Sequence, residues 1–157
     1  MGMTTAVDQV ESWLKEFSLK QGSKMGLDEQ GCCHLKSVDD ECLIIEAPAG
    51  DIMYVSSVLG VIYDDPVSAG IMREALIKNL FQGDTMGGSI AFDPSNDAMM
   101  LCFSRSVSKM DYFEFENIIF NLFGVSAQLR AGLFGVEDAA QAQASTTLSF
   151  GMEGIRV

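Results

Sequence analysis

The stretch from Asp64 to Phe92 constrains the fold most, because it holds a helix start, an apolar helix, a glycine-rich turn and a strand. Asp64 and Asp65 supply an N-cap, and Pro66 suits the first helical turn, where its missing N–H costs nothing. At helical spacing, apolar residues follow three lines: Val67, Ile71 and Ala75; Met72, Leu76 and Leu80; and Ile77 and Phe81. One sheet cannot cover all three lines, and a chain of 157 residues has little interior for the rest. The sequence therefore predicts a helix that is shared with a second copy of the chain.

The remaining pattern predicts an α+β fold. Turn residues at 39–40 and 48–51 join three short strands, which must therefore run as an antiparallel meander. The predicted order is a helix at 5–20, strands at 32–38, 42–47 and 52–59, the central helix, a two-stranded hairpin at 89–92 and 99–104, and a helix at 111–133. We expect one twisted antiparallel sheet packed with helices.

The predicted domain covers residues 1–135, and residues 136–157 form a tail. The tail is rich in Ala, Gln and Ser and has too little apolar surface to offset its ordering cost, so we expect it to be flexible. Leu148, Phe150 and Met152 alternate within it, which leaves a short docking strand as the alternative.

Both faces of the meander carry apolar side chains, which is more than a sheet with one solvated face needs. One face would hold Cys33, Leu35, Leu43, Ile45, Ala47, Met53 and Val55. The other face would hold Ile44, Tyr54 and Val58. We expect a further element or a partner to cover this second face.

The formal net charge of −12 makes nucleic acid and anionic membrane surfaces poor partners, because the long-range field repels both. No apolar run approaches the length of a membrane span, and the first residues lack the pattern of an export signal. The expected location is the cytoplasm.

No catalytic or metal-binding constellation is found, so we expect neither an enzyme nor a cofactor. Cys32, Cys33 and His34, with Cys42, come nearest, but adjacent strand residues point to opposite faces and no Cys-x-x-Cys spacing is present. We expect the cysteines to be reduced, buried thiols.

The segment Ala75–Phe81, Ala-Leu-x-x-Asn-Leu-Phe, is followed by Gly87-Gly88 and a short apolar strand. Further along come Met100–Phe103, Val107 and an aromatic-rich helix from Tyr112. With the order of elements, these features resemble the class I chaperones of type III secretion effectors, the Tir chaperone family. The resemblance covers residues 5–133.

This resemblance implies a homodimer without enzymatic activity, which binds an extended N-terminal segment of a secreted effector. The implied dimer interface, on the second helix and the following strand, comprises Ile71, Met72, Leu76, Ile90 and Phe92. The implied effector-binding residues are Trp13, Phe17, Leu35, Ile44 and Tyr54. The ATPase of the secretion apparatus is a further partner to test.

Two other functions stay open at this point. One is a dimeric α+β adaptor that binds a folded regulator. The other is a small ligand-binding protein or thiol enzyme that uses Cys33 or His34.

Overall fold

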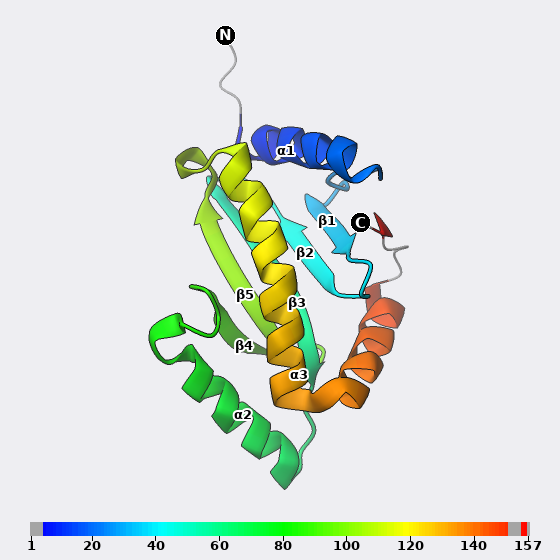
Figure 1. Cartoon of the computed structure of the whole chain (residues 1–157), viewed down its shortest axis with the longest axis vertical. Helices are drawn as coiled ribbons and strands as arrows, with labels where there is room; N and C mark the ends of the chain where they lie inside the picture. Colours follow the sequence, from blue (N-terminus) through cyan, green and yellow to red (C-terminus); the bar gives the residue numbers. More distant parts are fainter. Residues whose placement is uncertain (1–4, 151–154, 157) are drawn as a thin grey trace. The chain divides into compact units, whose positions relative to one another are not determined.

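The computed structural model describes the backbone of residues 5–150, 155 and 156, and the side chains of residues 5–135. The chain forms two compact units, which we describe one at a time. The first unit comprises Met1–Val55, Ser104–Phe123 and Gly154–Val157, and the second comprises Ser56–Phe103 and Gly124–Glu153. Figure 1 labels the helices and strands. Strands β3 (Ile52–Val61) and β5 (Ala98–Ser106) and helix α3 (Tyr112–Phe150) belong partly to each unit.

The first unit begins with helix α1 (Ala6–Gln21), which is capped at both ends. Thr5 and Asp8 form a capping box, in which each side chain accepts a hydrogen bond from the other residue's backbone N–H. Gly22 ends the helix in the left-handed conformation, with φ of 67°. The buried stripe consists of Val10, Trp13, Leu14 and Phe17.

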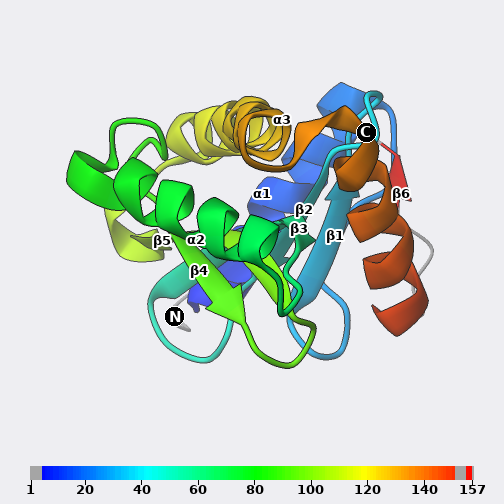
Figure 2. The same cartoon turned by 90° about the horizontal axis from the view of Figure 1, so that it is seen from below.

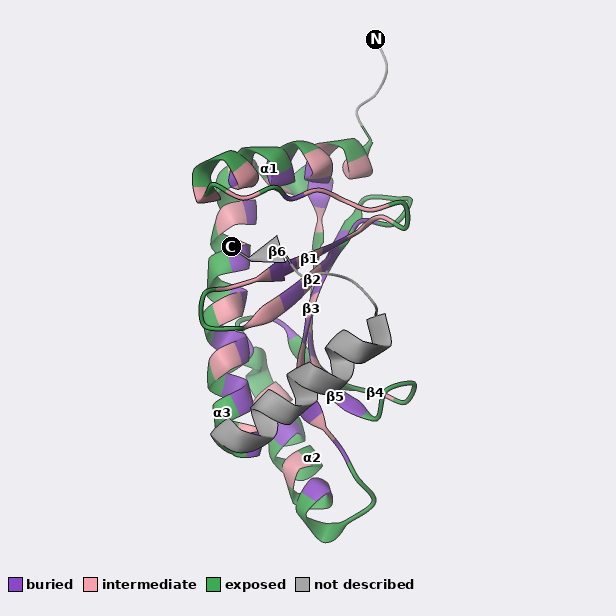
Figure 3. Ribbon diagram, turned by 90° about the vertical axis from the view of Figure 1, so that its right-hand side faces the viewer, coloured by how far each residue is buried: buried purple, intermediate pink, exposed green. Residues whose placement is uncertain are grey.

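The meander of the first unit follows the predicted strand parity. Strand β1 (Cys32–Lys36) pairs antiparallel with β2 (Cys42–Glu46), so that Cys33 lies opposite Ile45 and Leu35 opposite Leu43. All seven residues expected to share one face with Cys33 and Leu35 are at most 3% exposed, so this face is the inner one. Figure 3 shows the alternation of buried and more exposed residues along these strands.

An aromatic cluster closes the core of the first unit. The ring of Phe115 lies 5.6 Å from Trp13, 6.3 Å from Phe17 and 6.3 Å from Tyr112, between ring centroids. Phe17 meets Phe115 edge to face, which is a favoured geometry for aromatic pairs. The start of α3 and the stripe of α1 are therefore held together by tilted and edge-to-face ring contacts.

In the second unit, helix α2 (Pro66–Asn79) packs beside strand β4 (Ser89–Asp93) (Figure 2). The Asp65 carboxylate caps the helix by accepting from the Ser68 N–H at 2.7 Å, as the sequence predicted. At the other end, the Asn79 side chain binds the backbone of Ile90. The Ile90 N–H donates to Asn79 Oδ1 at 2.7 Å, and Asn79 Nδ2 donates to the Ile90 carbonyl at 2.9 Å.

We expect Asn79→Ala to lower the free energy of unfolding by about 1–3 kcal/mol, because two part-buried backbone groups lose their partner. Urea unfolding measures this. Gln82→Ala is the matched control, since Gln82 is exposed and reaches only the Ser89 hydroxyl, at 3.4 Å. Equal effects of the two substitutions would contradict a structural role for the Asn79 amide.

The strand order is β4-β5-β3-β2-β1-β6, and β4 and β5 form the predicted antiparallel hairpin. The predicted α+β fold, with three helices and five antiparallel strands, is confirmed. Two short 3-10 helices, η1 (Leu80–Gln82) and η2 (Val107–Lys109), complete it. Strand β6 (Ile155–Arg156) is additional and pairs parallel with β1.

Helix α3 continues past the predicted end of the domain. Its backbone is interrupted at Gly135, with φ of 74° and ψ of 173°, and is helical again to Phe150. Leu148 and Phe150 therefore lie in a helix, and the strand of the tail is β6 instead. The side chains of 136–150 and residues 151–154 lie outside the described residues, so the division at residue 135 stays a prediction.

Between Tyr112 and Gly135, α3 is long and apolar enough to cross a bilayer, with a mean hydropathy of 1.3. The expectation that no apolar run reaches this length was wrong. A core helix meets the same criteria, however, and this one has a buried arginine. The Arg130 side chain donates to the Val58 carbonyl at 2.7 Å, within the second unit. Phe115 and Arg130 thus place two parts of α3 in the protein core.

Candidate partner-binding surfaces

Helix α2 and the turn that follows it leave two of the three predicted apolar lines exposed to solvent. In one of these lines, Ile77 and Phe81 are 50% and 93% exposed. Met72, Leu76 and Leu80 follow one another at four-residue spacing and are 39%, 70% and 64% exposed. We call these three residues the outer line. Within α2 only Ser68 and Ala75 are buried. An exposed apolar row of this kind marks an interaction surface in a folded protein.

The predicted dimer residues fall into two groups. Met72, Leu76 and Phe92 are exposed and therefore accessible to a second copy of the chain. Ile71 is half-buried, and Ile90 is 5% exposed because it faces the core of the second unit. Ile90 thus supports the packing of α2 on β4 and has no surface to offer a partner.

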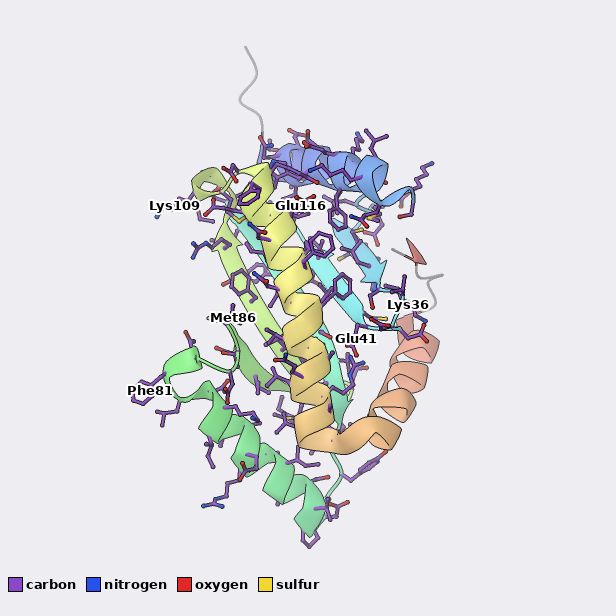
Figure 4. All side chains as sticks on the ribbon, viewed as in Figure 1. Lys36, Glu41, Phe81, Met86, Lys109 and Glu116 are labelled. Carbon is purple, nitrogen blue, oxygen red and sulfur yellow. The ribbon has the colours of Figure 1, made fainter. Side chains whose placement is uncertain are left out.

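Phe81 was predicted to continue the helix, but the structure places it in a tight loop. It has a left-handed backbone, with φ of 61°, and its side chain is 93% exposed. Figure 4 shows the side chain pointing away from the ribbon. Gln82 and Met86 also have positive φ, and such strained non-glycine positions cluster at functional sites. Gly83 and Gly87 predicted a turn, but no sequence pattern indicated a strained backbone at Phe81.

The outer face of the meander forms a second exposed surface, in the first unit. Tyr54 is 45% exposed and Ile52 is 37% exposed, while Ile44 is half-buried. We call these three residues the outer sheet patch. Their parity opposes that of the buried residues on the same strands, as the sequence predicted for Ile44 and Tyr54.

Three predicted effector-binding residues belong to the core instead. Trp13, Phe17 and Leu35 are at most 5% exposed, because α1 and the inner sheet face pack against the aromatic cluster. A partner cannot gain contact area from side chains that are already covered. The docking surface proposed below therefore omits these three residues.

Trp13 nevertheless lines a hollow of about 410 Å³ in the first unit, together with Asp51 and Tyr112. The Asp51 carboxylate accepts hydrogen bonds from the hydroxyls of Ser106 and Ser108. These bonds, led by that from Ser106, lower the pKa of Asp51, so the carboxylate stays ionised. An aromatic wall beside an anion suits a basic side chain.

The sequence analysis missed three exposed apolar residues on the helices of the first unit. Leu19 on α1 is 84% exposed, and Phe113 and Phe120 on α3 are 67% and 50% exposed. The spacing of Phe113 from the buried stripe position Phe115 would have indicated the exposure, since residues two apart on a helix do not share a face.

The geometry around the cysteines and His34 bears on the thiol-enzyme alternative. Among the residues that the structure describes, no group of three or more His, Cys, Asp or Glu side chains is placed to hold a metal ion. Burial raises the pKa of Cys33 to about 11, which disfavours the nucleophilic thiolate. Only Cys33 is buried; the other three cysteines are partly exposed, which corrects the expectation that all four are covered.

We expect Cys33 to resist thiol reagents in the native protein. With its pKa near 11, roughly one Cys33 in a thousand carries a thiolate at about pH 8. Titration with Ellman's reagent, before and after unfolding, measures this, and Cys33→Ser should leave the fast native reaction unchanged. Rapid stoichiometric labelling of Cys33 would instead favour a thiol enzyme.

Solved structures with the same fold include chains of three protein complexes, one of which is a chaperone–effector complex. The ExsC–ExsE complex contains a chain with a TM-score of 0.68 and 20% identity, covering 85% of this chain and 97% of that chain. The HopA1–SchA chaperone–effector complex gives a TM-score of 0.62 at 16% identity, covering 80% and 95%. The ExoU–SpcU complex from the type III secretion system of Pseudomonas aeruginosa gives 0.61 at 15% identity, covering 81% and 99%.

Sequence comparison identifies the family directly. No curated protein sequence matches this chain. The profile of the Tir chaperone protein (CesT) family, however, matches residues 12–130, which span both units and the surfaces described above. The chain belongs to the Tir chaperone protein (CesT) family.

Proposed function

We propose that this protein is a dimeric chaperone that binds the N-terminal segment of a type III secretion effector and keeps it extended until export. The chaperone character follows from the family. The observation that carries the effector-binding role is the outer sheet patch, which exposes Tyr54 and Ile52 to solvent beside Ile44. Apolar side chains on a solvated sheet face fit a partner that supplies its own apolar side chains.

The proposed dimer forms through the outer line of α2. Leu76 lies at its centre and is 70% exposed in the single chain. Phe92 on β4 and Phe81 in the neighbouring loop add exposed aromatic rings within the same unit. Aromatic anchors are typical of interface centres, and pairing two copies of this surface would remove all of it from water.

The proposed client segment is extended and carries basic as well as apolar residues. The net charge of −12 favours such a segment by electrostatic attraction. Ordering an extended segment costs several kcal/mol, so a large contact area must compensate for it. The negative charge also favours docking to a basic surface on the secretion ATPase. We propose that the protein acts in the cytoplasm. We also propose that it acts by binding alone, without catalysis.

Co-expression with the protein encoded by the neighbouring open reading frame tests this function. We expect a soluble complex in which proteases spare one N-terminal segment of the client. Tyr54→Glu should weaken client binding at least about tenfold, because burying an ionised carboxylate replaces a favourable apolar contact. Isothermal titration with the protected segment measures the change.

Tyr63→Glu is the matched control, since Tyr63 is 63% exposed but lies outside the outer sheet patch. It should bind the client as the unmodified chain does. A client that remains fully protease-sensitive in the complex, or that binds the Tyr54→Glu and Tyr63→Glu variants equally, would contradict the proposal.

A further inference from the structure

The outer sides of β4 and β1 are each contacted in part by another segment of the chain. An edge strand exposes backbone N–H and C=O groups that pair readily with any extended segment. On β4 the Asn79 side chain satisfies both backbone groups of Ile90. On β1 the corresponding role falls to β6, and Figure 2 shows β6 beside β1.

The pairing of β6 with β1 is short and parallel. Leu35 lies opposite Ile155 and Lys36 opposite Arg156, so two of the five positions of β1 are matched. Parallel pairing is slightly weaker per residue than antiparallel pairing. Each backbone hydrogen bond contributes only about 0.5–1.5 kcal/mol net, and ordering the two residues consumes much of that. A longer extended segment would therefore displace β6 from this edge.

Nevertheless, β6 holds the edge against competitors because it belongs to the same chain. A tethered segment has an effective concentration in the millimolar range when its linker spans the distance. A two-residue pairing can then occupy the edge for most of the time while remaining easy to displace. The result is an edge that is covered in the isolated protein and available to a ligand of sufficient length.

We propose that β6 is a built-in competitor, which occupies the β1 edge until a client segment adds there as a strand and displaces it. The inference rests on the proposed function and specifies how the client-binding site is regulated. In this proposal, residues 155–156 of this chain occupy the β1 edge in the isolated protein, and an extended client peptide displaces them. The affinity for the client is then reduced by the fraction of molecules in which β6 is bound.

The double variant Ile155→Pro/Arg156→Pro tests the competition in the full-length chain. Proline removes the backbone N–H groups that a strand needs. The matched control, Ile155→Val/Arg156→Lys, keeps both N–H groups. Amide hydrogen exchange should become faster only near Leu35 and Lys36, the β1 residues that β6 matches, and only in the proline variant. The amides that join β1 to β2 should stay protected in all three proteins and report an intact fold.

The first probe is a labelled synthetic peptide of residues 148–157 of this chain. We expect it to bind the proline variant about 3- to 10-fold more tightly than the unmodified chain or the control, because only the variant leaves the edge open. Equal affinities for all three proteins would overturn the proposal. This arm uses no client and so does not depend on the proposed function.

The second probe is the protease-protected client segment, which should gain affinity for the proline variant by the same factor. An unchanged client affinity, with the peptide arm positive, would overturn the competition, because the client would then bind elsewhere. A client segment that binds none of the three proteins, with the peptide arm positive, would contradict the proposed function while confirming that β6 occupies the edge.

Discussion

Leu76→Glu is expected to convert the proposed dimer into a folded monomer. Leu76 is 70% exposed in the single chain, so the substitution has little effect on the fold itself. In the proposed dimer it would place an unpaired carboxylate in an apolar contact, which costs several kcal/mol, and twofold symmetry doubles this cost. We expect the dissociation constant of the dimer to rise by at least about 10³-fold. Light scattering after size exclusion measures the mass, and circular dichroism reports the fold.

Leu19→Glu is the matched control for this experiment. Leu19 is also a helical leucine and is 84% exposed, but it lies on α1 in the first unit. This variant should remain a dimer at the same concentrations. A Leu76→Glu protein that stays dimeric would place the interface elsewhere, and a monomeric unmodified chain would end the proposal of a dimer.

Phe115→Ala is expected to lower the free energy of unfolding by about 3–5 kcal/mol. The Phe115 side chain is fully buried and contacts the rings of Trp13, Phe17 and Tyr112. Its removal leaves a cavity, and three aromatic rings lose their common partner. Domains of this size have only about 5–15 kcal/mol of stability, so the variant loses a large fraction of the total. Urea unfolding followed by tryptophan fluorescence measures the loss through Trp13.

Phe113→Ala separates this effect from helix propensity. Phe113 lies two residues away on the same helix but is 67% exposed. We expect its replacement to change the stability by less than about 0.5 kcal/mol. Similar losses for both variants would show that the aromatic cluster does not hold the start of α3.

Strand parity predicted which residues of the meander share a face, because successive residues point to opposite sides. It separated Tyr54 and Ile44 from the other set, but it did not tell which of the two faces points outward. Helical spacing is less decisive about burial. A residue beside the buried stripe of a helix is covered or exposed according to its neighbours in the folded chain. Trp13 and Phe17 were accordingly assigned to a binding surface, whereas the rings of Phe115 and Tyr112 bury them.

The surface of the proposed dimer was also only partly predictable from the sequence. Helical spacing identified the line of Met72, Leu76 and Leu80 and the surplus of apolar surface on α2. The spacing did not reveal that Ile90 is held in the core or that Phe81 leaves the helix with a positive φ. Backbone strain at a non-glycine residue depends on the surrounding packing and has no local signature.

The sequence alone determined the type and order of the elements, the helix ends at Asp65 and Gly22, and which strand residues share a face of the sheet. These features depend on residues within a few positions of one another, so the sequence pattern is sufficient to predict them. The tertiary structure alone decided which apolar side chains stay exposed and which segment lies at the β1 edge. Exposure and strand pairing join residues as distant as Leu35 and Ile155, and only the folded chain brings them together.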